Sequence, residues 1–134
     1  YCCSESVTDD QKEFVNKLCS SFGKVMPLPE SYFPLFCSIA GCAPAYAYMF
    51  IDSLARSAVK NGMNKSVALE IAAQTVLGSA KKILESDEHP WELIDKVCSP
   101  GGTTIEGIVS LQKDGFESAV CNAVDAALQK DKKV

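Results

Sequence analysis

Apolar residues recur at helical spacing in the first part of the chain. A helix is predicted to begin at Thr8, because a threonine followed three residues later by Gln11 forms a capping box. Its apolar face comprises Phe14, Val15, Leu18, Cys19 and Phe22. The following segment, 24–30, carries two prolines that exclude helix, so we expect a short extended strand there. A helix followed by a strand is typical of an α/β unit, and the chain is expected to begin partway through such a domain.

From Ser31 onward the pattern predicts helices only. The "AGCAPAY" segment, 40–46, is expected to interrupt them, with Pro44 in the first turn of a new helix. Thr103 and Glu106 are spaced as a second capping box. The predicted helices are 33–39, 44–60, 64–86, 90–97, 103–115 and 116–134.

These helices are more apolar than a small monomer requires. The run "AYAYMFI", 45–51, is apolar on every side and should be buried all round. Small residues in the next helix would allow close packing across a two-fold axis: Ala68, Ala72, Ala73 and Gly78. Surplus apolar surface usually marks a partner, so we expect an obligate homodimer.

Composition and charge exclude several classes. The chain has 134 residues, enough for one domain plus part of another, with 47% hydrophobic and 22% charged residues. Its net charge is −4 and no basic stripe alternates with aromatics, which argues against nucleic acid as a partner. The longest apolar run, 43–51, is too short to span a bilayer, so no membrane association is expected. No secretory leader pattern is recognised.

Seven cysteines are present, an odd number that suits a disulfide framework poorly. No CxxC or His-x-His spacing indicates zinc, and no metal is expected. Cys19, Cys37, Cys42 and Cys121 are expected to be small buried hydrophobes. Reduced thiols favour a cytoplasmic protein. A secreted, cysteine-rich helical protein is the alternative, and it would require paired cysteines.

The segment "VCSPGGTTIEG", 97–107, places a proline, two glycines and two threonines directly before a helix. Free amides at Gly101, Gly102, Thr103 and Thr104 could form a site for a small anion such as a carboxylate. The alternative is an ordinary turn between two helices. The segment lacks the lysine of a P-loop, and the chain contains no GxGxxG.

Two further polar groups precede this loop. His89, the only histidine, comes just before Pro90 and is interpreted as a helix cap rather than a catalytic group. Asp87 and Glu88 are either solvated acids in a turn or acids placed near a ligand held by the glycine loop.

The segments "EHPWELIDKVCSPGGTTIEG", "PAYAYMFIDSLARSAVKNGM" and "ALEIAAQTVLGSAKKILES" together resemble pyrroline-5-carboxylate reductases from about Phe33 to the end of the chain. The resemblance implies a mainly α fold, a helical bundle of the 6-phosphogluconate-dehydrogenase C-terminal-domain type that forms an intertwined dimer. It further implies two parts. Residues 1–30 would be the last helix and strand of a Rossmann dinucleotide-binding domain, and 31–134 would be the dimerisation and substrate-binding domain.

The same resemblance implies the reduction of 1-pyrroline-5-carboxylate to L-proline with NADPH or NADH, bound mainly by an N-terminal domain outside this chain. The enzyme would be a cytoplasmic homodimer or a larger assembly of dimers. By resemblance, Thr104 approaches the substrate ring as the catalytic residue, and Asp87 is an acid near the ring nitrogen. The implied substrate-binding residues are Ser99, Pro100, Gly101, Gly102, Thr103, Thr104 and Asp87.

The sequence departs from the family before "PAY", where the family usually has Ser-Gly-Ser-Gly and this chain has 40–43, Ala-Gly-Cys-Ala. Two other functions therefore stay open. One is a paralogue that reduces a different cyclic imine, and the other is a non-catalytic dimerisation module.

Overall fold

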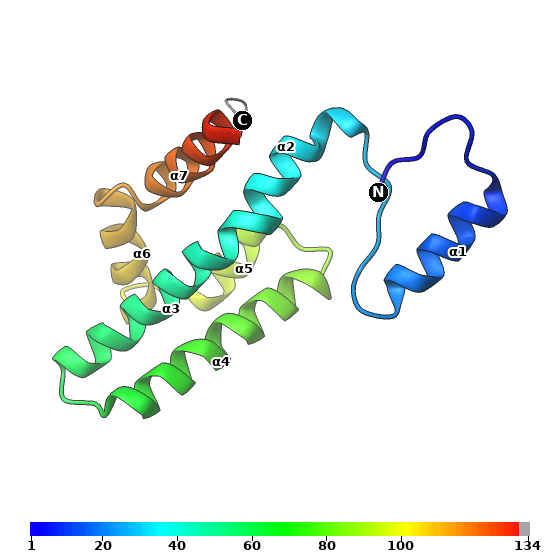
Figure 1. Ribbon diagram of the computed structural model, residues 1–134. Helices are drawn as coiled ribbons and strands as arrows, with labels where there is room; N and C mark the ends of the chain where they lie inside the picture. Colours follow the sequence, from blue (N-terminus) through cyan, green and yellow to red (C-terminus); the bar gives the residue numbers. More distant parts are fainter. Residues whose placement is uncertain (132–134) are drawn as a thin grey trace.

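The computed structural model describes residues 1–131, which form helices joined by short turns (Figure 1). The elements in chain order are α1 (Asp9–Ser20), a 3₁₀ turn η1 (Glu30–Tyr32), α2 (Phe33–Phe36), a π-helical segment η2 (Cys37–Cys42), α3 (Ala43–Lys60), α4 (Lys65–Leu84), α5 (Pro90–Val97), α6 (Thr103–Lys113) and α7 (Phe116–Asp131). The mainly α prediction is confirmed. Residues 132–134 of the last predicted helix lie outside the described part of the chain.

Helix α1 stands apart from the other helices at the end of an extended segment (Figure 1). Its predicted capping box is confirmed. The Gln11 amide donates to Thr8 Oγ1 over 3.3 Å, and the Thr8 amide donates to Gln11 Oε1 over 3.0 Å. Its apolar face is largely uncovered within the described residues, with Phe14 68% and Phe22 78% exposed.

The predicted strand at 24–30 is wrong as a strand, because no strand is assigned within residues 1–131. The segment is extended, however, and it pairs with the first residue. The Tyr1 amino group donates to Met26 O over 3.0 Å, and the Leu28 amide donates to Tyr1 O over 2.9 Å. Met26 and Leu28, on either side of Pro27, thus both form a backbone hydrogen bond with Tyr1, which is the hydrogen-bond pattern of two parallel strands. The described chain supplies no neighbouring strand that would continue the ladder.

The predicted break at 40–46 is also wrong. The backbone stays helical from Glu30 through η2 into α3, ending at Lys60. We attribute the π segment to Pro44, which has no backbone N–H to donate to the carbonyl four residues before it. The backbone accommodates this lost hydrogen bond by forming a wider helical turn. Within it, Ser38 is buried, and its hydroxyl donates to Pro34 O over 3.0 Å.

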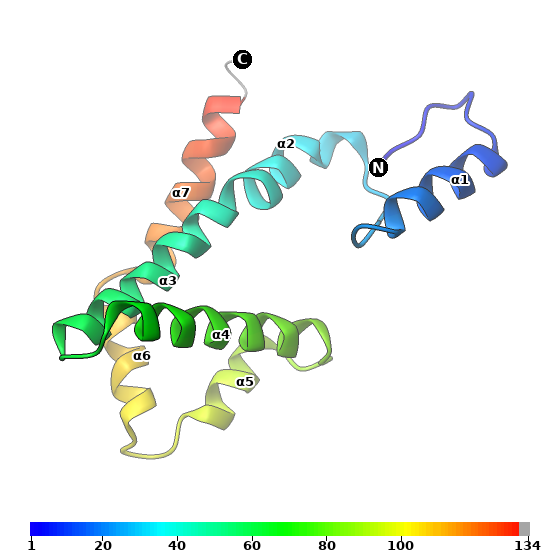
Figure 2. The same cartoon turned by 60° about the horizontal axis from the view of Figure 1, so that its bottom comes forward.

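Helices α3 and α4 run antiparallel side by side (Figures 1 and 2). The turn between them contains Gly62 at a φ of 96°, a conformation that favours glycine. The buried hydrophobic residues of the described chain lie at this contact: Ala55, Ala68 and Ala72. Ala68 and Ala72 therefore serve close packing within the chain, and the prediction that they face a two-fold partner is wrong for both.

Helices α5, α6 and α7 contribute no buried hydrophobic residue within the described chain. Helices α5 and α6 lie below α4 in Figure 2, and α7 leaves in another direction. The accessible surface is 10685 Å², whereas a compact monomer of this mass should expose roughly 6,800 Å². Cys37 and Cys121 are exposed rather than buried as predicted, because these open faces have no cover within the chain.

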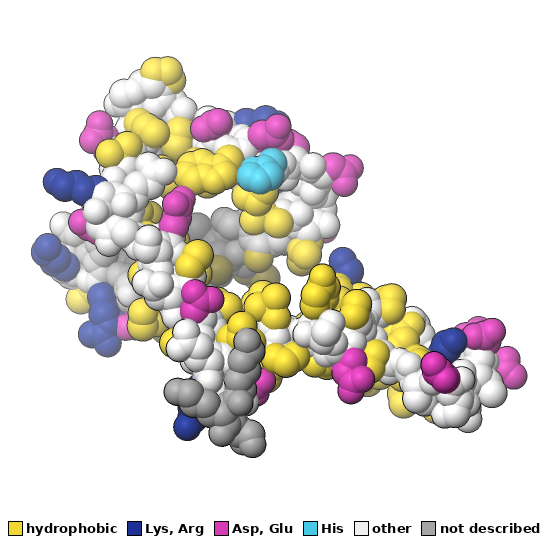
Figure 3. Space-filling view, turned by 90° about the horizontal axis from the view of Figure 1, so that it is seen from above, with side chains coloured by type: hydrophobic (Ala, Val, Ile, Leu, Met, Phe, Trp, Pro, Cys, Tyr) yellow, Lys and Arg dark blue, Asp and Glu magenta, His cyan; other side chains and the backbone are white. Residues whose placement is uncertain are grey.

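Hydrophobic side chains are spread over the exposed surface, including the long arm visible in Figure 3. The continuous helix Glu30–Lys60 is long and apolar enough to cross a membrane by length and composition. Length and composition do not separate a membrane span from a helix covered by a protein partner, because both exclude water from the same side chains.

Candidate functional site

The "SPGG" segment forms a tight turn between α5 and α6. The Gly102 amide donates to Ser99 O over 2.9 Å, with Pro100 and Gly101 as the two central residues and Gly101 at a φ of 68°. Proline followed by a residue of positive φ identifies a type II turn. Glycine is also required at position 102, because a Cβ there would lie 2.3 Å from Ser99 Oγ and 3.0 Å from Ser99 O. The turn therefore brings the Ser99 hydroxyl against the start of α6.

The N-terminus of α6 has no side-chain cap. Gly102 is the N-cap, and no side-chain hydrogen bond is made to the first turn. The predicted Thr103–Glu106 capping box is therefore wrong: the turn ends at Gly102, so Thr103 is already the first helical residue. The leading amides of an 11-residue helix are left open, at the positive end of its dipole. This is the geometry of an anion site.

Thr104, in this first turn, borders a groove of about 660 Å³ between α4, α5 and α6. The apolar wall of the groove includes Ile83, Leu93 and Ile108. Its polar lining residues are Gln74, Thr75, Ser79, Lys82, Lys96 and Thr104. The other predicted loop residues, Ser99, Pro100, Gly101, Gly102 and Thr103, are not part of the lining. Thr104 is thus the loop residue that connects the turn to this groove.

His89 caps α5, as predicted. Its Nδ1 accepts from the Trp91 amide over 3.2 Å, and the Glu92 carboxylate accepts from the His89 amide over 3.1 Å. Pro90 follows at the first helical position, where its missing N–H costs nothing. Local chemistry thus fixes the start of the short helix that leads into the glycine turn.

The two acids at the α4–α5 corner differ in their surroundings. Asp87 is exposed and forms no hydrogen bond or ion pair within the described residues. The Glu88 carboxylate is half-buried; it pairs with Lys96, and Lys82 Nζ lies 4.0 Å away. The hydrogen bond from Lys96 holds the pKa of Glu88 below its ordinary value of 4.5, against the opposing effect of desolvation. The sequence indicated Glu88, with Asp87, as either a solvated acid or an acid near the ligand. It did not indicate the pairing with Lys96 and Lys82, because these contacts depend on how the corner folds.

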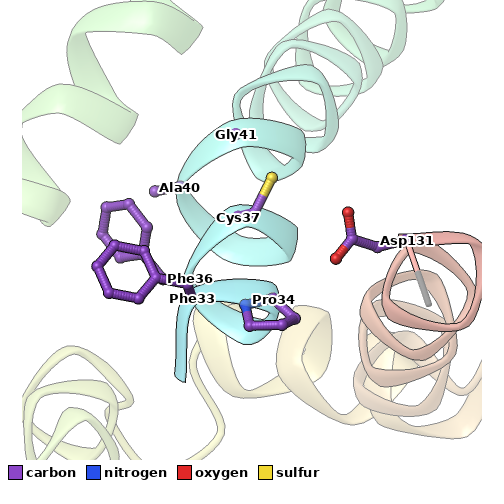
Figure 4. A pocket seen from close by; sticks show the side chains of 7 residues that line it. All are labelled: Phe33, Pro34, Phe36, Cys37, Ala40, Gly41 and Asp131. Carbon is purple, nitrogen blue, oxygen red and sulfur yellow. The ribbon is translucent and has the colours of Figure 1, made fainter. Parts of the chain in front are cut away.

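A second cleft, which the sequence did not indicate, lies beside the segment that departs from the family pattern. It measures about 540 Å³ and is lined by Phe33, Pro34, Phe36, Cys37, Ala40, Gly41 and Asp131 (Figure 4). The Asp131 carboxylate extends from α7 toward the side of α2 and η2 that carries Cys37. Ala40 and Gly41 thus face a cleft rather than the glycine turn.

The described residues do not fit a dinucleotide. The site for its pyrophosphate requires a glycine-rich turn between a strand and a helix, and residues 1–131 contain no strand. The open helix N-terminus at α6 follows another helix, and Gly102 closes against Ser99 there. We therefore assign none of these residues to a nucleotide.

Comparison with known sequences identifies the helical part. A family described as "Pyrroline-5-carboxylate reductase dimerisation" matches residues 30–134. The pyrroline-5-carboxylate reductase of Escherichia coli strain K12 is 41% identical over 128 residues, which are 96% of this chain and 48% of that protein. The chain spans about half the length of the curated relatives it matches.

Solved structures give the same result. A Plasmodium falciparum pyrroline carboxylate reductase with NADP bound superposes with a TM-score of 0.90 at 38% identity, covering 99% of this chain and 51% of that one. A 1-pyrroline-5-carboxylate reductase from Streptococcus pyogenes gives 0.91 at 41% identity, covering 98% and 51%. The alignments extend over nearly the whole chain, so α1 and the extended segment are included in the likeness.

Proposed function

The chain belongs to the pyrroline-5-carboxylate reductase family, and we propose that the protein encoded by its complete reading frame reduces 1-pyrroline-5-carboxylate to L-proline with NADPH or NADH. The relatives' names support the reaction, and the NADP in the Plasmodium falciparum structure supports a nicotinamide cofactor. In this proposal the chain contributes substrate binding and dimer formation. The nucleotide is bound mainly by a further domain, because the described residues do not fit it.

The observation that carries the substrate assignment is the uncapped start of α6 after a type II turn. The substrate carboxylate would accept hydrogen bonds from the Thr103 and Thr104 amides and from the Ser99 hydroxyl, at the positive end of the helix. The Thr104 side chain then faces the ring. Asp87 is the proposed acid near the ring nitrogen. A protonated imine is already electrophilic, so the residues need only bind and orient it.

We further propose a homodimer formed by residues 31–134, with 1–30 as the end of the dinucleotide-binding domain. The exposed surface supports this, because 10685 Å² exceeds the expectation for a compact monomer by roughly 3,900 Å². Permanent dimer interfaces bury about 2,000–5,000 Å² in total, or about 1,000–2,500 Å² from each partner, so a dimer interface accounts for part of this surplus. With seven free thiols, the cytoplasm is the proposed location.

The test is to purify the protein encoded by the complete reading frame and to follow nucleotide oxidation with 1-pyrroline-5-carboxylate, using a six-membered cyclic imine acid for comparison. Thr104→Val keeps the side-chain shape and removes the hydroxyl, so kcat/KM should fall about 5- to 100-fold with little change in Tm. Ser110→Ala is the matched control on an exposed position of the same helix and should leave kcat/KM unchanged. An inactive wild-type protein contradicts the reaction. If the wild type prefers the six-membered imine, the proposed substrate is wrong. If Thr104→Val changes kcat/KM by less than about two-fold, Thr104 is not part of the substrate site.

A further inference from the structure

The carboxylate of Glu88, at the corner between α4 and α5, has several polar contacts. It pairs with Lys96 through Oε2, while Oε1 accepts from the Ser86 hydroxyl over 3.3 Å and lies 4.0 Å from Lys82 Nζ. The Ser86 hydroxyl also accepts from the Glu88 amide over 3.1 Å. We call these four residues the corner network: Ser86, Glu88, Lys82 and Lys96.

The corner network joins two of the three helices that border the groove, α4 and α5. Lys82 is in the last turn of α4, and Lys96 is in the last turn of α5, three residues before Ser99. Both lysines line the groove that Thr104 borders. Helical side chains lean toward the N-terminus, so Lys96 can reach back along α5 to the residue just before its cap. The pair of Glu88 and Lys96 therefore links the two ends of α5. The glycine turn starts at the end that carries Lys96.

Asp87 depends on the same contacts. Between Glu85 and His89 the chain is not helical, and the recorded hydrogen bonds that hold Glu88 there are those with Ser86 and Lys96. Asp87 is next to Glu88 and has no polar contact of its own within the described residues. The two predicted substrate-contacting parts, Asp87 and the turn at 99–104, thus lie at opposite ends of α5. Glu88 is the side chain that contacts both ends.

We propose that Glu88 is a positioning residue for the cyclic imine substrate, acting by holding the Asp87 corner and the glycine turn in a fixed relation through Lys96 and Lys82. The proposal rests on the proposed function, because it concerns the same substrate site. It differs from a purely stabilising ion pair in what it predicts. A stabilising pair changes Tm alone, whereas a positioning residue changes the KM for the imine and leaves the KM for the nucleotide unchanged.

The chain offers a matched control. Glu85 and Lys81 form an exposed pair at 3.7 Å in the same last turn of α4, and neither residue lines the groove. Glu88→Gln and Glu85→Gln each remove one negative charge with little change in shape. Both would be made in the protein encoded by the complete reading frame, and kcat, both KM values and Tm would be measured at low and high salt.

We expect Glu88→Gln to raise the KM for 1-pyrroline-5-carboxylate at least about three-fold, with Glu85→Gln close to wild type. Lys96→Gln should have the same effect, and the charge swap Glu88→Lys with Lys96→Glu should restore the KM in part. In the wild type the KM should rise with salt, because exposed ion pairs are screened.

Equal KM values for Glu88→Gln and Glu85→Gln overturn the inference, as does a fall in Tm without a change in KM. If Glu88→Gln fails to fold, Lys96→Gln is compared with Glu85→Gln instead, and equal KM values for these two variants overturn the inference. An active wild type with unaffected variants overturns this inference alone. A wild type that does not reduce the imine overturns the proposed function together with it.

Discussion

Replacing Gly102 by alanine tests whether the turn before α6 is as tight as the structure indicates. The new Cβ would lie 2.3 Å from Ser99 Oγ and 3.0 Å from Ser99 O. The hydroxyl can rotate away, but the carbonyl oxygen belongs to the turn and accepts the 2.9 Å bond from the Gly102 amide. The substitution therefore has to open the turn, at a cost of about 1–3 kcal/mol for overpacking.

Gly107 provides the comparison on the same helix. Nothing lies within 4 Å of a Cβ at that position, so Gly107→Ala should stabilise the helix by about 0.5–1 kcal/mol. The two alanine variants should thus differ by about 1.5–4 kcal/mol in the free energy of unfolding. A second variant, Ser99→Ala with Gly102→Ala, removes the hydroxyl clash but keeps the carbonyl clash. The double variant should recover only part of the free energy of unfolding that Gly102→Ala loses.

Urea unfolding of the purified chain, followed by circular dichroism, measures these differences. All variants must be compared at one protein concentration, since association would shift the midpoint. If Gly102→Ala and Gly107→Ala change the free energy by the same amount, the turn is not closed against Ser99. The proposed carboxylate site would then lose its geometric basis. In the active protein, Gly102→Ala should also raise the KM for the imine, because the Ser99 hydroxyl is displaced.

Three further predictions concern assembly, cofactor and pH. In the proposed dimer folding and association are coupled, so the Tm of the chain should rise with protein concentration; a stable monomer by sedimentation at micromolar concentration would contradict the dimer. The chain alone should bind NADPH only weakly in calorimetry, because residues 1–131 contain no strand–glycine–helix unit, and micromolar affinity would refute this. Hydrogen bonds from Lys65 and Lys96 lower the pKa values of Asp52 and Glu88 respectively. Their contribution to stability is therefore present above the ordinary values of 3.8 and 4.5 and is lost as the pH falls through the lowered pKa values. Urea midpoints between neutral and acid pH should show this, with a smaller decline in Glu88→Gln.

Features set by neighbouring residues could be predicted from the sequence. The Thr8 capping box and the His89 cap each depend on a few adjacent side chains and one or two backbone angles. The same holds for the glycine turn, because proline followed by glycine has few other conformations available. The predicted cap of α6 was wrong by one residue for a related reason. Thr103 would be a better cap than Gly102, but the turn ends at Gly102 and fixes where the helix begins.

Features that depend on packing could not be predicted in the same way. The spacing of Ala68 and Ala72 shows that a helix can be approached closely, but it does not identify the approaching helix, and α3 of the same chain takes that place. Segment 40–46 was expected to interrupt the helices, with Pro44 in the first turn of a new one. Pro44 does lie in the first turn of α3, but the preceding π turn lets the helix continue. The groove at Thr104 and the contacts of Glu88 arise only when α4, α5 and α6 come together.

The open shape of the chain is consistent with its apolar sequence only if a partner covers it. Only alanines are buried among the hydrophobic residues described, while Tyr48 and Met49 of the "AYAYMFI" run are 70% and 73% exposed. In globular proteins most helical stability comes from packing of an apolar face rather than from propensity, and short helices such as α5 and α6 are marginal in water without it. The contact between α3 and α4 buries too little to supply it. Exposed apolar residues also line the groove that Thr104 borders, among them Ile83 and Val97, so a partner that covers them should also set the shape of the substrate site. A variant that weakens association should therefore raise the KM for the imine before the protein unfolds.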